Sequence, residues 1–208
     1  MRLLGVFGGT FDPVHYGHLR TVTEVQRTLS LSSVHLIPAA QPPHRAAAVA
    51  SGEHRLAMLD LALQDFPDLQ VDARELRRAG VSYTIDTLSS LKKDFADETL
   101  CLIVGSDAFQ GLSSWHRWEG LFELANIVVM QRPDKQVGGN LPAWAIKRIV
   151  DDANGLRKQA SGLIWIDEVT PQPISATRIR DAIRSGQPVS DYVPPAVEAY
   201  IHKHQLYS

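Results

Sequence analysis

Apolar runs of strand-like composition alternate with segments of helical period along this sequence, and this alternation limits the possible folds more than any other feature. Strands that are almost wholly apolar must be covered on both faces, so they indicate a mainly parallel sheet with crossover helices. We therefore predict an α/β fold with a doubly wound, mainly parallel sheet. Its strands are expected at residues 3–8, 34–39, 69–73, 100–105, 126–131 and 163–167.

Apolar residues at spacings of three and four follow each of the first three runs, as expected for amphipathic helices. These residues are Leu19, Val22, Val25 and Leu29, then Leu56, Leu59, Leu63 and Phe66, and then Ile85, Leu88, Leu91 and Phe95. The length of 208 residues suits one well-buried core. We expect a single domain over residues 1–208, with terminal helices within residues 174–208.

Composition limits the partners that the chain could bind. The 21 Lys and Arg residues and 23 Asp and Glu residues leave a net charge of −2, so no general cationic field favours nucleic acid or an anionic membrane. The apolar stretches are too short for a signal peptide or a membrane span, so we expect a cytoplasmic protein. The single cysteine, Cys101, lies in an apolar run and is expected in the core.

The first apolar run leads into GGTFDPVHYGHLR at residues 8–20, the place where a fold of this class binds ligands. Gly8 and Gly9 allow the backbone to approach a phosphate closely. His15 and His18 lie where a helix is expected to begin, near His18, and a helix start favours anions. The standard phosphate loops, G-x-x-x-x-G-K-[ST] and G-x-G-x-x-G, are absent from this turn. Two histidines are too few for a zinc site, so we expect no protein-bound metal.

A second candidate for phosphate binding is ISATRIR at residues 174–180. Ser175, Thr177 and Arg178 offer hydroxyls, helix-start amides and a guanidinium, which suit a triphosphate. The alternative is that Ser175 only caps a helix. Asp107 has two interpretations too, since it could bind a ribose or help to hold a magnesium ion, or it could cap a helix. The basic run at residues 73–80 is expected to be solvated surface.

These two motifs resemble the paired elements of the HxGH nucleotidyltransferases. GGTFDPVHYGHL resembles the signature GGxFxPxHxGH, and ISATRIR resembles the Ser/Thr-Arg element. Further segments resemble, in the same order, those of bacterial-type nicotinate mononucleotide adenylyltransferases, so the resemblance covers essentially the whole chain. They are PPHR (42–45), SYTIDTL (82–88), GSDAF (105–109), the region of Trp115 and QRP (131–133). Arg45 is a departure, because the family more often has lysine there.

The resemblance implies a Rossmann-like nucleotidyltransferase fold and a reaction of NAD biosynthesis. The implied enzyme transfers AMP from ATP to nicotinate mononucleotide and releases nicotinate adenine dinucleotide and pyrophosphate. The phosphate of the mononucleotide would attack the α-phosphorus of ATP directly and in line, without a covalent enzyme intermediate. Mg²⁺ would arrive with ATP and bridge its phosphate oxygens.

The resemblance also implies roles for individual residues. The implied catalytic residues are His15, His18 and Arg178. The implied ATP ligands are Gly8, Gly9, Thr10, Phe11, Gly105, Asp107, Ser175, Thr177 and Arg178. The implied ligands of the mononucleotide are His44, Arg45, Tyr83, Thr84, Trp115 and Arg132, with Trp115 stacked on the pyridine ring and Trp118 left to the core. Amide groups at a helix start near Thr84 would favour nicotinate over the neutral amide.

Other functions remain in competition at the level of sequence. Phosphopantetheine adenylyltransferases share both phosphate elements, but they resemble this chain less in length, in SYTIDTL and at Trp115. Cytidylyltransferases are more distant competitors. A non-catalytic nucleotide sensor belongs to a different class, and the intact set of phosphate-contacting residues argues against it. The sequence does not determine the oligomeric state.

Overall fold

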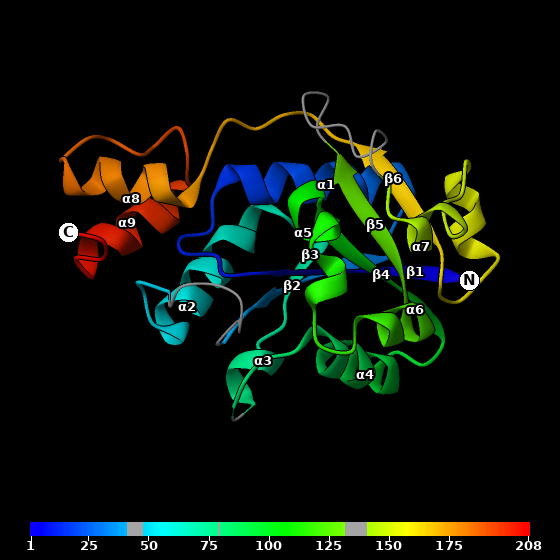
Figure 1. Cartoon of the computed structure of the whole chain (residues 1–208). Coiled ribbons are helices and arrows are strands. Elements are labelled where there is room, and N and C mark those ends of the chain that lie inside the picture. The colour runs from blue at the N-terminus through cyan, green and yellow to red at the C-terminus, as the bar shows by residue number, and fades with distance from the viewer. Residues whose placement is uncertain (41–47, 79, 132–140) are drawn as a thin grey trace.

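The computed structural model describes residues 1–40, 48–78, 80–131 and 141–208. Within this part of the chain, six strands form one sheet in the order β3-β2-β1-β4-β5-β6 (Figure 1), and every neighbouring pair is parallel. The strands are β1 (Arg2–Gly9), β2 (Ser33–Pro38), β3 (Leu69–Val71), β4 (Glu98–Gly105), β5 (Ala125–Gln131) and β6 (Ile164–Glu168). The predicted doubly wound α/β fold is confirmed.

Helices cover both faces of the sheet (Figure 1). The described helices are α1 (Tyr16–Leu29), α2 (Gly52–Ala62), α3 (Arg74–Arg77), α4 (Thr84–Asp94), α5 (Ser106–Gln110), α6 (Leu121–Leu124), α7 (Ala143–Ile146), α8 (Ala176–Arg184) and α9 (Pro195–Lys203). Apolar residues of α1, α2, α8 and α9 form one core cluster with the sheet, and those of α4, α5, α6 and α7 form the other. Strand order reverses between β1 and β4, which lie side by side at the middle of the sheet.

Side-chain alternation along β1 explains why its sequence is almost wholly apolar. Leu3 and Phe7 join the cluster that contains α1, whereas Leu4 and Val6 join the cluster that contains α4. Successive residues of a strand point to opposite faces, so a strand covered on both sides needs apolar residues at every position. Cys101 follows the same rule in β4, where it is fully buried, and burial raises the pKa of its thiol to about 12.

The boundaries of several elements differ from those expected from the sequence. Helix α1 begins at Tyr16, with His15 as its N-cap, and so starts before the predicted His18. Leu63 and Phe66 lie beyond α2, because the chain tightens into a 3-10 turn at Leu63–Asp65. Strand β3 ends at Val71, two residues earlier than predicted.

A buried asparagine attaches the segment before β6 to the sheet. Asn126 in β5 is fully buried, and its Nδ2 donates to the main-chain oxygens of Leu156 (3.3 Å) and Gln159 (3.1 Å). Its Oδ1 accepts a hydrogen bond from the main-chain nitrogen of Leu163 at 2.9 Å. One side chain therefore binds three main-chain groups of this segment, and its bond to Leu156 lies inside the protein, where a polar group needs a partner.

We predict that Asn126→Ala lowers the free energy of unfolding by about 3 kcal/mol, because buried main-chain groups lose their partners. Chemical denaturation at pH 7 measures this loss. The exposed Asn154, whose amide contacts Asp152, provides the matched control, and Asn154→Ala should change stability by less than about 0.5 kcal/mol. Equal losses for the two variants would contradict the structural role of Asn126.

Candidate active site

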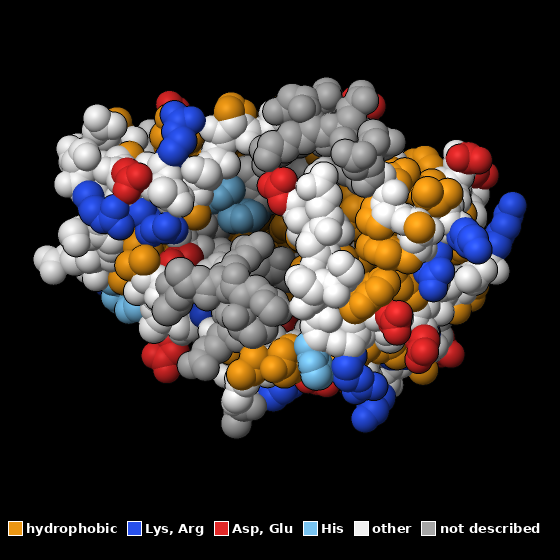
Figure 2. All heavy atoms as spheres, viewed as in Figure 1, with side chains coloured by type: hydrophobic (Ala, Val, Ile, Leu, Met, Phe, Trp, Pro, Cys, Tyr) orange, Lys and Arg blue, Asp and Glu red, His pale blue; other side chains and the backbone are white. Residues whose placement is uncertain are grey.

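Two adjoining cavities lie at the carboxyl ends of β1 and β4. The larger has a volume of about 650 Å³ and lies between the loop after β1 and the starts of α5 and α8. The smaller has a volume of about 260 Å³ and lies between the strand ends, the start of α4 and the segment around Trp115. They share a wall made of Gly8, Gly9, Thr10, Ile103, Val104, Asp107, Ala108 and Trp115. Figure 2 shows histidine side chains within a hollow of this face.

The loop after β1 is shaped around the ring of Phe11. Phe11 is buried and has a φ of 49°, in the left-handed region that costs a non-glycine residue on the order of 1 kcal/mol. Its ring makes edge contacts with Phe7 and His18, at centroid distances of 5.8 and 5.1 Å. A Cβ at Gly9 would lie 2.9 Å from the Phe11 ring, so a glycine is required there. The packed ring thus maintains a strained backbone beside the larger cavity.

His15 and His18 stack on each other in the wall of the larger cavity. Their ring centroids are 3.7 Å apart and their planes differ by 24°. His15 is only 5% exposed, and burial lowers its pKa to about 4, so its imidazole is neutral at pH 7. A Cβ at Gly17 would lie 2.9 Å from the His15 ring, which explains the glycine between the two histidines. A neutral imidazole retains one N–H donor for a phosphate oxygen.

The start of α8 forms the opposite side of the larger cavity. Ser175 is the N-cap, and its Oγ accepts a hydrogen bond from the main-chain nitrogen of Arg178 at 3.3 Å. Ser175 and Thr177 both line the cavity, so the capping role and a place at the site coexist. Arg180 lines it too, and its guanidinium donates to Thr177 Oγ1 (3.3 Å) and to the main-chain oxygen of Asp12 (2.7 Å).

Arg178 differs from the other residues predicted on α8, because its side chain does not line either cavity. It is exposed and donates to the main-chain oxygen of Pro173 at 3.2 Å. Residues three apart share a helix face, so Arg180 follows Thr177 into the cavity, whereas Arg178 points elsewhere. Arg180 is not among the residues predicted from the sequence, although its spacing of three from Thr177 is the signal that would have found it.

The other residues predicted at the nucleotide site lie together. Gly8, Gly9 and Thr10 line both cavities, and Phe11 lines the larger one. Gly105 is the N-cap of α5 and lines the larger cavity. Asp107 lies in the first turn of α5 and lines both cavities, at their junction.

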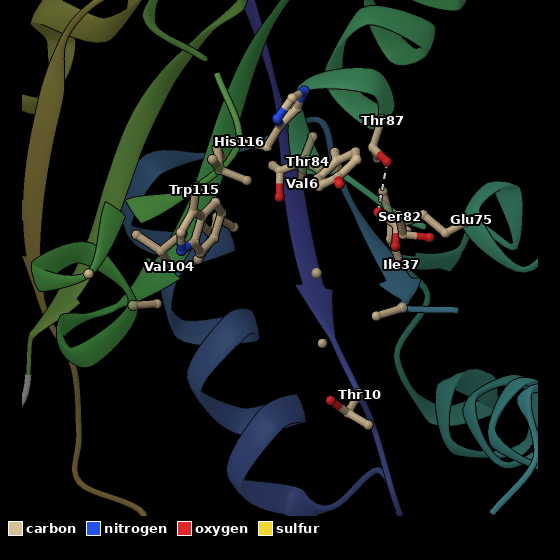
Figure 3. Close-up of a pocket in the computed structure, with 18 of the residues that line it drawn as sticks. Val6, Thr10, Ile37, Glu75, Ser82, Thr84, Thr87, Val104, Trp115 and His116 are labelled. Atoms are coloured by element: carbon tan, nitrogen blue, oxygen red, sulfur yellow. Dashed lines mark hydrogen bonds between the residues drawn. The ribbon is translucent and has the colours of Figure 1, made fainter. Parts of the chain in front are cut away.

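Aromatic side chains surround the smaller cavity (Figure 3). Tyr83 and Trp115 line it, as does His116, whose ring lies 4.2 Å from that of Tyr83 with a tilt of 32°. Helix α4 begins at Thr84, where no side chain of the described residues caps the helix start. Trp118, expected in the core, is half-buried and contacts Trp144 at a ring distance of 5.0 Å.

A carboxyl group lies in the wall of the smaller cavity, in the run expected to be solvated surface. Glu75 is 8% exposed, and Thr87 Oγ1 donates to its Oε1 at 2.7 Å (Figure 3). Burial raises the pKa of Glu75. Ser82 and Thr87 line the same cavity, and they are, like Glu75 and His116, not among the residues predicted from the sequence. The basic neighbours of Glu75 hid its inward orientation, since a four-residue helix is too short to show a periodic pattern.

Three of the predicted ligands cannot be placed. His44, Arg45 and Arg132 lie outside the described residues.

Among the residues that the structure does describe, no helix has the length and apolar character needed to cross a membrane.

Comparison with known proteins identifies relatives along the whole chain. The model of the cytidylyltransferase-like family matches residues 6–182. A chain from Methylococcus capsulatus, named probable nicotinate-nucleotide adenylyltransferase, is 47% identical over 99% of this chain and 100% of its own length. A chain of the same name from Pseudomonas putida is 45% identical over 100% of this chain and 95% of its own length.

A solved structure shares the fold. It is the nicotinic acid mononucleotide adenylyltransferase of Plasmodium falciparum complexed with NaAD, with a TM-score of 0.73 and 17% identity over 100% of this chain and 98% of that chain. The order of strands and the place of the cavities at their carboxyl ends follow the general rule for such sheets.

The buried imidazole of His15 should make stability depend on pH. Above pH 6.5 the histidine is neutral in both the folded and the unfolded chain. As the pH falls from 6.5 to about 4, the unfolded chain binds a proton that the folded chain does not, so the free energy of unfolding decreases. We predict that His15→Asn removes up to about 3 kcal/mol of this decrease. Urea unfolding of both proteins between pH 4 and pH 8 measures it, and parallel pH profiles would contradict the prediction.

Proposed function

Since the chain belongs to the cytidylyltransferase-like family and, within it, to the nicotinate-nucleotide adenylyltransferases, we propose that its two cavities divide the two substrates. The enzyme transfers AMP from ATP to nicotinate mononucleotide and forms nicotinate adenine dinucleotide and pyrophosphate, a step of NAD biosynthesis. One observation carries the proposal: the two cavities share a wall at the ends of β1 and β4. Ligands in both cavities would meet at this wall.

The larger cavity is proposed to hold ATP. The main chain of residues 8–11 would approach the phosphates, and His15 and His18 would donate to them. Across the cavity, the β- and γ-phosphates of ATP would be held by Ser175, Thr177 and Arg180. The placement of Arg180 supports this role for it, and the exposed position of Arg178 speaks against the role implied for that residue.

The smaller cavity is proposed to hold the pyridine ring of the mononucleotide. Trp115 and Tyr83 supply aromatic surfaces for stacking, and the start of α4 at Thr84 offers amide groups to a carboxylate. The carboxamide of the neutral mononucleotide would present N–H donors to these amides, and two facing donors lose their hydrogen bonds. The roles of His44, Arg45 and Arg132 in binding the mononucleotide stay predictions.

The proposed reaction is a single in-line displacement. An oxygen of the mononucleotide phosphate forms a bond to the α-phosphorus of ATP, and the bond from that phosphorus to the α,β-bridging oxygen breaks, so that pyrophosphate leaves with the electron pair. Such a reaction asks the protein mainly to align two anions and to stabilise growing charge. The stacked histidines and the guanidinium of Arg180 suit this task.

We also propose Mg²⁺ as the cation that accompanies ATP. When bound, it would neutralise charge on the triphosphate. Asp107 fits this cation, because a carboxylate at the junction of the two cavities offers the oxygen ligands that magnesium prefers. Asp107 could also bind the ribose of ATP.

Two further parts of the proposal concern the whole chain. The packing of α8 and α9 in the same apolar cluster as α1 and α2 supports a single domain over residues 1–208. The cytoplasmic location expected from the sequence stays a prediction. ATP and nicotinate mononucleotide are the proposed partners.

Product identification tests the proposed substrates directly. We predict that the protein, incubated with ATP, Mg²⁺ and a panel of acceptors, forms nicotinate adenine dinucleotide and pyrophosphate. The panel contains nicotinate mononucleotide, nicotinamide mononucleotide and 4′-phosphopantetheine. The specificity constant for the acid should exceed that for the amide by at least about tenfold, which corresponds to about 1.4 kcal/mol. Equal constants would contradict the carboxylate site at α4, and turnover of phosphopantetheine alone would contradict the assignment of the acceptor.

The two arginines of α8 provide a matched pair of variants. We predict that Arg180→Ala raises the Michaelis constant for ATP by at least about tenfold, because a charge-assisted hydrogen bond contributes about 1.5 to 3 kcal/mol. Arg178→Ala should change it by less than about twofold, since that side chain lies outside both cavities. Steady-state kinetics at saturating acceptor measures both values. The opposite ranking would restore Arg178 as the triphosphate ligand.

A further inference from the structure

The last residues of the chain reach the loop that follows β1. Tyr207 lies four residues beyond the end of α9, is 6% exposed, and donates its hydroxyl to Asp12 Oδ1 at 2.7 Å. Residues near a chain terminus are usually poorly ordered unless specific contacts hold them. Here the contact joins residues 195 positions apart, within the apolar cluster that contains α1 and α9.

Asp12 is the centre of a buried network. The residue is 5% exposed, and its carboxylate also accepts hydrogen bonds from the main-chain nitrogens of Val49 (2.7 Å) and Ala50 (3.1 Å). Its two oxygens thus receive three donors from two separate parts of the chain, one of them the Tyr207 hydroxyl. A buried carboxylate needs such partners, because burial without them is costly.

The same network includes two arginines that contact the main chain of the loop. Arg180 donates to the main-chain oxygen of Asp12 at 2.7 Å, and Arg55 donates to that of Thr10 at 2.8 Å. Arg180 and Thr10 line the larger cavity. A shift of Asp12 would therefore move both a wall of that cavity and the carbonyl that orients Arg180.

We propose that Tyr207 is a positioning residue of the ATP site. Its hydroxyl holds the Asp12 carboxylate, and through Asp12 it fixes the loop after β1 and the guanidinium of Arg180 for the triphosphate. This inference rests on the proposed placement of ATP in the larger cavity. Tyr207 does not line either cavity, so it acts through Asp12 and not by contact with substrate.

The chain offers a matched control in Tyr200 of α9. The hydroxyl of Tyr200 lies 3.0 Å from Nδ1 of His54 in α2, so it also joins the C-terminal region to the body of the protein by one hydrogen bond. Neither Tyr200 nor His54 lines the two cavities. Tyr207→Phe and Tyr200→Phe therefore each remove one hydroxyl that joins the C-terminal region to the rest of the protein, and only the hydroxyl of Tyr207 contacts the loop.

The test measures ATP affinity and both Michaelis constants for the wild-type protein and the two variants. We expect Tyr207→Phe to weaken ATP binding in calorimetry, without acceptor, and to raise the Michaelis constant for ATP by at least about threefold, the effect of one modest hydrogen bond. The constant for nicotinate mononucleotide should stay within about twofold. Tyr200→Phe should leave the ATP affinity and both constants unchanged. An unfolded fraction lowers the turnover number but not a Michaelis constant, so a loss of stability would not mimic this pattern.

Each other outcome would contradict the inference. ATP binding by Tyr207→Phe that equals that of Tyr200→Phe would remove Tyr207 from the site. Equal increases in both Michaelis constants would indicate general loosening, and a variant that failed to fold would show that the hydroxyl supports the whole core. A wild-type protein that binds ATP but forms no dinucleotide would refute the proposed function, while the calorimetric comparison would still test the role of Tyr207.

Discussion

The parallel pairing of β1 with β4 at the point where strand order reverses is the constraint on which the site depends. Helix α1, which follows β1, packs on one face of the sheet, and α5, which follows β4, packs on the other. The two segments of chain therefore diverge at the strand ends and leave a space between the segments. Both cavities occupy this space and share its wall. His15 after β1 and Trp115 beyond β4 reach one site only because the two strands are neighbours.

The electrostatics of the site suit the meeting of two phosphorylated substrates. A chain with a net charge of −2 has no general field to attract them, so the attraction must be local. The starts of α4 at Thr84 and of α8 at Ala176 line the cavities, where the positive end of a helix dipole favours an anion, and Arg180 adds a guanidinium. Burial keeps His15 neutral, so it contributes a dipole and a donor instead of a full charge. In the proposed function, this arrangement would stabilise phosphate oxygens mainly through oriented groups that need little rearrangement during the reaction.

Much of the fold could be predicted from the sequence, because apolar runs and helical periods are local signals. The GGTFDPVHYGHL segment could be placed at the site, because it directly follows the first of these apolar runs. The other features of the site depend on which way a side chain points, or on contacts between residues that are far apart in the sequence. The ISATRIR segment contains both Arg178 and Arg180, and the helical turn decides which of the two side chains faces the cavity. Glu75 is inward-facing among basic residues, and Tyr207 meets Asp12 only through the folded core. No periodic pattern in the sequence marks the position of Glu75 or that of Tyr207.

The site is proposed to align the two substrates for one direct displacement at the α-phosphorus of ATP. A nucleophile on the protein would instead split the reaction into two displacements through a covalent adenylyl intermediate. The most direct measurement uses ATP that is chiral at the α-phosphorus through sulfur and oxygen-isotope substitution, with nicotinate mononucleotide as acceptor, and determines the configuration of the dinucleotide product by phosphorus NMR. A single direct displacement predicts inversion of configuration at this phosphorus, and retention would contradict it.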